Sequence, residues 1–78
     1  MNAKTLSLQA PPATAADRLE TTLQRRLGNR IRDLRVLQLP SGIILQGRSA
    51  TYHAKQLATH AAMELSDLPV LANEIEVL

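Results

Sequence analysis

The stretch that decides the fold is LRVLQLPSGIILQG, residues 34–47. Its centre, Pro40-Ser41-Gly42, is a strong turn signal with apolar residues on both sides. After the turn, Ile43-Ile44-Leu45 is a β-branched and aliphatic run bounded by glycines, which predicts a short strand that Gly47 closes. The residues before the turn lack a helical period and predict a strand that begins near Leu34. We therefore expect a β-hairpin at the centre of the chain.

A helix is predicted before this hairpin. Thr14 and Asp17 have the spacing of a capping box, in which each side chain accepts a backbone N–H of the other residue. Leucines then repeat at intervals of four residues, which places them on one side of a helix. Gly28 follows the last of them, where a left-handed cap often ends a helix. The pattern predicts a helix over residues 15–27, with its apolar stripe formed by Leu19, Leu23 and Leu27.

A second helix and a third strand are predicted after the hairpin. Thr51 is a suitable N-cap for a helix from Tyr52 to Leu65, and the apolar stripe of this helix is mostly alanine, which allows close approach to a sheet. The run Asp67-Leu68-Pro69 ends the helix. Residues 70–78 alternate in their second half and predict a strand. Its expected inward residues are Leu71, Asn73, Ile75 and Val77.

These elements predict an α+β domain with the order α-β-β-α-β. Two helices are expected to pack on one face of a three-stranded sheet within residues 14–78, while residues 1–13, which contain two prolines, are expected to form a flexible tail. The predicted core consists of Leu19, Leu23, Leu27, Leu45, Leu57, Ala61, Ile75 and Val77.

An ordered set of motifs runs through residues 15–78. It consists of Gly42, then Leu45-Gln46-Gly47, then Thr51 with Lys55 four residues later, the alanines of the second helix, and the closing Asn73-Glu74-Ile75-Glu76-Val77. Together with the order of elements, this set resembles the BON family of small bacterial domains. The closing phrase is its most recognisable part, although Ala72 stands where the family usually has valine. The resemblance implies the α+β fold, no catalytic residues, and a role in attachment to phospholipid surfaces or within larger envelope proteins.

Composition restricts the remaining possibilities. A chain of 78 residues with 45% apolar residues is expected to form one domain, and the absence of cysteine excludes disulfides and thiol chemistry. No signal peptide or apolar run long enough to cross a membrane is visible, so the chain as given is expected in the cytoplasm. If it is a domain of a longer protein, the resemblance to the BON family points to the periplasm or envelope.

No enzymatic, metal or cofactor site is expected. His53 and His60 lie two helical turns apart, about 10 Å at 1.5 Å per residue, which is too far to share one ion. His60 and Glu64 alone would supply two ligands, fewer than zinc sites usually have. The hydroxyls of Ser41, Ser49 and Thr51 are accounted for by turn and cap positions, without the sequence context of a nucleophile.

Positive charge is concentrated in one part of the chain. Six arginines fall within residues 18–35, and they are Arg18, Arg25, Arg26, Arg30, Arg32 and Arg35. They are expected either to form an ordinary solvated surface or to bind an anionic phospholipid surface, where each contributes about 1 kcal/mol. Nucleic acid is the alternative ligand. The chain has no Phe or Trp to stack on bases and no Gly-x-x-Gly clamp, which makes this alternative less favoured.

The sheet is also expected to have an apolar outer face. Successive strand residues point to opposite faces, so Ile44 must point away from the helices if Ile43 and Leu45 point toward them. Either Val36 or Leu37 of the first strand shares the face of Ile44, and we assign Val36 together with Ile44 to a self-association face. Such a face predicts a protein partner or a homodimer, or else scattered exposed aliphatic residues.

Overall fold

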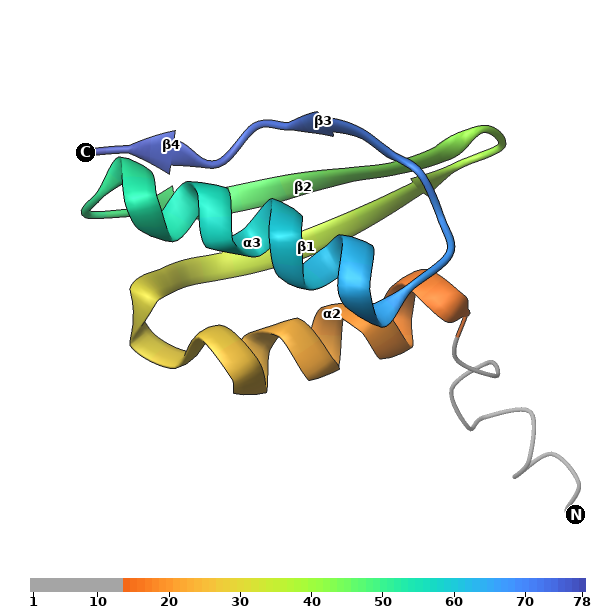
Figure 1. The fold of residues 1–78 in the computed structure, drawn as a ribbon, viewed down its shortest axis with the longest axis horizontal. Helices are drawn as coiled ribbons and strands as arrows, with labels where there is room; N and C mark the ends of the chain where they lie inside the picture. Colours follow the sequence, from red (N-terminus) through yellow and green to blue (C-terminus); the bar gives the residue numbers. More distant parts are fainter. Residues whose placement is uncertain (1–13) are drawn as a thin grey trace, which may run out of the picture.

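The computed structural model describes residues 14–78, and the expected flexible tail, residues 1–13, lies outside this range. Figure 1 shows its elements in chain order, and these are helix α2 (Ala15–Leu27), the short 3-10 helix η1 (Gly28–Arg30), strand β1 (Ile31–Leu39), strand β2 (Gly42–Ser49), helix α3 (Tyr52–Leu65), strand β3 (Val70–Asn73) and strand β4 (Glu76–Val77).

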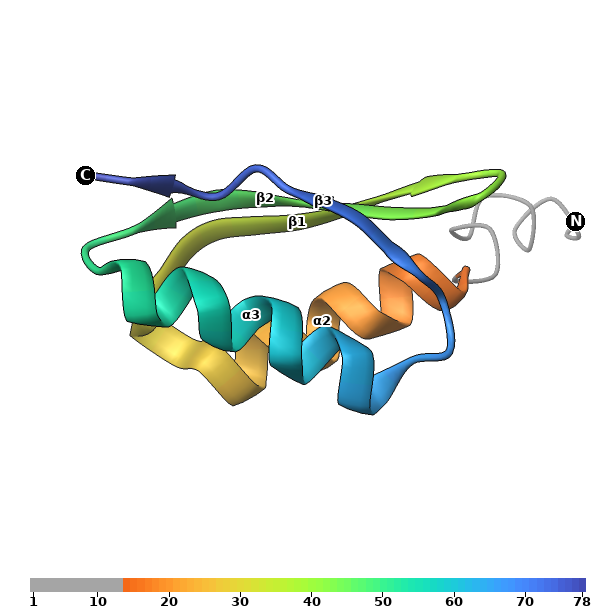
Figure 2. The ribbon, with the colours of Figure 1, turned by 45° about the horizontal axis from the view of Figure 1, so that its top comes forward.

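The sheet has β2 at its centre. Strand β1 pairs with β2 in antiparallel orientation, and β3 and β4 pair in parallel orientation with successive parts of its other edge. Helices α2 and α3 lie on the same face of the sheet, and within residues 14–78 the opposite face carries no helix (Figure 2). The predicted α+β class is therefore confirmed. The predicted strand count was wrong, because the last strand is divided into two.

Local capping signals explain why both helices lie at their predicted bounds. The Thr14 hydroxyl accepts the Asp17 backbone N–H at 3.0 Å, and the Asp17 carboxylate accepts the Thr14 N–H at 3.2 Å. Thr51 caps α3 by accepting the Ala54 N–H at 3.0 Å. Gly28 ends α2 with a φ of 55°, a value that glycine adopts without a side-chain clash. Its ψ of −131° lies outside the left-handed helical region, and the chain continues directly into η1.

The hairpin strands are longer than predicted. Strand β1 begins at Ile31 instead of Leu34, with a bulge around Asp33, whose φ is 55°. Strand β2 continues through Gly47 to Ser49, so Gly47 does not close it. A Cβ at position 47 would lie 3.0 Å from the side chain of Ile31, and the φ of Gly47 is 153°. This glycine therefore marks a close approach between the strands opposite the bulge.

Asn73 explains the division of the third predicted strand. Its Nδ2 donates to the Lys55 carbonyl at 2.8 Å and to the Thr59 hydroxyl at 2.7 Å, while its Oδ1 accepts the Ile75 N–H at 3.0 Å. The Glu74 N–H donates to the Leu45 carbonyl at 2.7 Å. Because the Ile75 N–H is taken by a side chain, regular pairing stops after β3 and resumes at β4.

The core lies between the sheet and the two helices. Six of the eight predicted core residues are buried, and they are Leu19, Leu23, Leu27, Leu45, Ala61 and Ile75. Leu57 is partly buried against them. Val77 was assigned wrongly, because it lies in a two-residue edge strand and is 42% exposed. Leu71 is also exposed, since the β2–β3 register shift leaves it between two paired residues and out of alternation.

The outer edge of β1 is covered by side chains of α2. The carboxylate of Glu20 accepts the Val36 N–H at 2.8 Å, and the side-chain amide of Gln24 donates to the Leu34 carbonyl at 3.0 Å. Glu20 and Gln24 are one helical turn apart, so they reach backbone groups two residues apart on the strand. Helix α2 thus satisfies polar backbone groups that β2 does not reach.

Candidate functional site

The first candidate site is the open face of the sheet, which we define as the face opposite the helices (Figure 2). One end of it is apolar. The register pairs Leu37 with Ile44 and Ile44 with Ala72, so these three form one row across the strands. Leu39 pairs with Gly42 in the next row, and Leu71 lies against Gly42, where its Cγ would be 2.9 Å from an added Cβ.

This apolar end is exposed to solvent. Leu37 and Leu39 are each 40% exposed, Leu71 is 45% exposed, and Ile44 is partly covered. The assignment of Ile44 to the outer face agrees with these positions. The assignment of Val36 was wrong, because Val36 pairs with Leu45, is only 5% exposed and belongs to the core. Leu37 takes its place, and the parity of β1 that the sequence left open is thereby settled.

The other end of the open face is charged, and its charges are separated by strand. Arg35 pairs with Gln46, whose side-chain amide donates to the Glu74 carboxylate at 3.1 Å. In the next row, Arg32 pairs with Arg48 and Arg48 with Glu76, which gives two rows that run from arginine on β1 to glutamate on the other edge. At this end, the open face is therefore positive along β1. It is negative along the other edge of the sheet, where Glu74 and Glu76 lie.

The six predicted arginines do not form one surface. Arg18 and Arg25 are exposed on α2, away from the buried stripe that faces the sheet. Arg26 forms an ion pair with Glu64 of α3 at 3.4 Å. Arg35 lies at the β1 edge, where its Nε is 3.7 Å from the Glu20 carboxylate.

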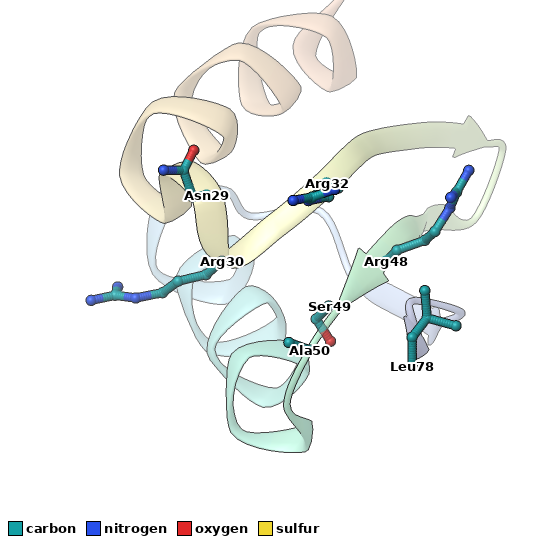
Figure 3. A pocket seen from close by; sticks show the side chains of 7 residues that line it. All are labelled: Asn29, Arg30, Arg32, Arg48, Ser49, Ala50 and Leu78. Carbon is teal, nitrogen blue, oxygen red and sulfur yellow. The ribbon is translucent and has the colours of Figure 1, made fainter.

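The remaining arginines line a hollow of about 280 Å³ at the end of the molecule where α2 leads into β1 and β2 leads into α3. Figure 3 shows the side chains of Arg30 and Arg48 pointing to opposite sides, with Arg32 between them. Arg48 is 3.4 Å from Asp33. Within residues 14–78, no carboxylate lies within 4.0 Å of Arg30 or Arg32. We call Arg30, Arg32 and Arg48 the basic end.

Sequence reasoning missed Arg48 in this group. Arg48 lies outside the arginine-rich stretch, and the antiparallel register brings it beside Arg32. Extending the predicted hairpin past Gly47 would have placed Arg48 opposite Asp33, because residues at equal distances from a two-residue turn face each other. The bulge around Asp33 shifts the register by one residue and brings Arg48 opposite Arg32 instead. The assumption that Gly47 ends the strand concealed this pairing.

The candidate hydroxyls and histidines have ordinary surroundings. The Ser49 hydroxyl donates to the Thr51 carbonyl at 2.9 Å, and Thr51 is the cap of α3. His53 and His60 are exposed. In the part of the chain that the structure describes, no three His, Asp or Glu side chains gather as metal ligands. Over the same residues, neither helix is long and apolar enough to cross a membrane.

Comparisons with known proteins add no relative to this description. No protein-family model, no curated protein and no solved structure matches the chain. The candidate sites are therefore defined by the geometry of this chain alone.

Proposed function

We propose that this chain is a non-enzymatic attachment module of the BON type, and that its basic end binds anionic phospholipid surfaces. The observation that carries the proposal is the hollow lined by Arg30, Arg32 and Arg48, in which two of the three guanidinium groups have no carboxylate within 4.0 Å among the described residues. Guanidinium groups donate paired hydrogen bonds that match the geometry of phosphate oxygens.

The expected binding is electrostatic and weak. Each arginine near an anionic surface contributes about 1 kcal/mol. The three arginines of the basic end outnumber the two acidic side chains beside Arg48, Asp33 and Glu76, which supports attraction to an anionic surface. Because charges in salt solution are screened over about 10 Å at 0.1 M, added salt should release the protein. The leucines of α2 are buried against the sheet and cannot insert into the membrane without unfolding.

The test is co-sedimentation with vesicles. Vesicles that contain phosphatidylserine should bind the protein at low salt, and vesicles of phosphatidylcholine alone should not. The double variant Arg30→Gln/Arg32→Gln removes two unpaired charges from the hollow and should weaken binding about thirtyfold, from about 2 kcal/mol lost.

A matched control removes the same charge elsewhere. Arg18→Gln/Arg26→Gln alters one exposed arginine of α2 and one that is already paired with Glu64, so it should weaken vesicle binding much less. Equal binding to both kinds of vesicle, or equal losses in the two double variants, would contradict the proposal. Tighter binding to a single-stranded oligonucleotide than to acidic vesicles at matched salt would reassign the basic end to nucleic acid.

A further inference from the structure

We infer that the open face of the sheet binds a second copy of this chain, face to face, about a two-fold axis parallel to β2. This inference does not depend on membrane binding. It is carried by the arrangement of the open face, which is apolar at one end of the strands and charged at the other, with the two charges on opposite edges.

The axis parallel to β2 makes the two faces complementary. A half-turn about this axis keeps the apolar end over the apolar end, so Leu37 and Leu39 lie near Leu71 and Ala72 of the second copy. The same half-turn exchanges the edges of the sheet. It therefore places Arg35 over the Glu74 of the second copy, and Arg32 over its Glu76.

Other arrangements are less favourable. A two-fold axis across the strands would place the apolar end of one copy over the charged end of the other, which would desolvate arginines without an opposite charge. In the arrangement with the axis parallel to β2, each outward residue of this central strand faces the same residue of the second copy. Ile44 then packs on Ile44, and Arg48 faces Arg48, although the Asp33 carboxylate 3.4 Å from Arg48 offsets this repulsion.

The size of the face predicts a weak dimer. Strand β1 has nine residues, and at about 3.3 Å per residue and 4.8 Å between strands the face measures about 30 by 14 Å. That footprint of about 400 Å² lies below the roughly 800 Å² per partner of a typical stable interface. Association should therefore be visible at high micromolar concentration and should disappear on dilution.

Charge reversal tests both the occupant and the axis. Arg35→Glu alone would face a like charge in its own dimer, and so would Glu74→Arg, so each should raise the dissociation constant roughly tenfold or more. An equimolar mixture of the two variants restores opposite charges at both contacts of the two-fold dimer. Sedimentation equilibrium should therefore give twice the 8.5 kDa chain mass for the unmodified chain and for the mixture, but not for either variant alone.

Two further variants keep the result interpretable. The Arg35→Glu change also removes the ion pair between Arg35 and Glu20 of α2. Circular dichroism must therefore show that each variant is folded. If Arg35→Glu unfolds, Ile44→Lys on the axis should likewise give a folded monomer, and Leu37→Lys should do the same. An unmodified chain that stays monomeric at high micromolar concentration overturns the inference. So do dimers of the single variants that are as stable as the mixed dimer.

Discussion

Asn73 provides the sharpest test of how the sheet and α3 are held together. Its side chain makes three hydrogen bonds. Two join the end of β3 to α3, at the Lys55 carbonyl and the Thr59 hydroxyl, and the third accepts the Ile75 N–H within the β3–β4 junction. All three are partly buried, and a hydrogen bond contributes about 1 kcal/mol net, while an unsatisfied buried group costs about 1–3 kcal/mol. Asn73→Ala should therefore lower the free energy of unfolding by about 2–4 kcal/mol.

The near-isosteric variant Asn73→Asp separates the three bonds. Its carboxylate can still accept the Ile75 N–H and the Thr59 hydroxyl, but it has no proton to donate to the Lys55 carbonyl. The free energy of unfolding of Asn73→Asp should therefore lie between that of the unmodified chain and that of Asn73→Ala.

Urea unfolding followed by circular dichroism measures these differences. Gln46→Ala is the control, because it removes one exposed hydrogen bond, to Glu74, on the open face. A loss of less than about 1 kcal/mol in Asn73→Ala, or one equal to that of Gln46→Ala, would refute the assignment of Asn73 as the tie between sheet and helix.

Two further predictions concern the core and the bulge. Leu23→Ala should cost about 2–5 kcal/mol because Leu23 is fully buried, whereas Arg25→Ala on the exposed side of the same helix should cost little, and equal urea midpoints for the two would contradict the packing. Gly47→Ala should lower the free energy of unfolding by about 1–3 kcal/mol, since the new Cβ would lie 3.0 Å from Ile31 and the φ of 153° disfavours a side chain. Thermal unfolding measures this loss, and an unchanged midpoint would contradict the close approach between the strands.

The helices were predictable because their limits are local. Thr14 with Asp17 and Thr51 form their caps within four residues of sequence, so no knowledge of the rest of the fold is needed. The strands were less predictable, because their limits depend on pairing. Gly47 has the sequence appearance of a strand end, but its position opposite the Asp33 bulge makes it an interior residue.

The candidate sites divide in the same way. The outward position of Ile44 followed from the alternation of β2, whereas β1 carries apolar residues at both parities and its orientation depends on the register with β2. For that reason Val36 was assigned to the wrong face. The arginine-rich stretch was visible in the sequence, but its separation into an exposed helix side, two ion pairs and a basic end depends on where each element packs.

The hydrogen bonds from Glu20 and Gln24 to the edge of β1 also limit the ways in which copies of this chain can associate. Exposed strand edges are templates on which further chains add, and such growth has no natural end. Here the Leu34 carbonyl and the Val36 N–H already bind side chains of the same molecule, so the middle of the β1 edge is not free to pair with another chain. The dimer that we propose would bury the open face of each copy and would therefore close at two copies. Detachment of α2 would remove the cover, and open-ended aggregation should then begin from β1.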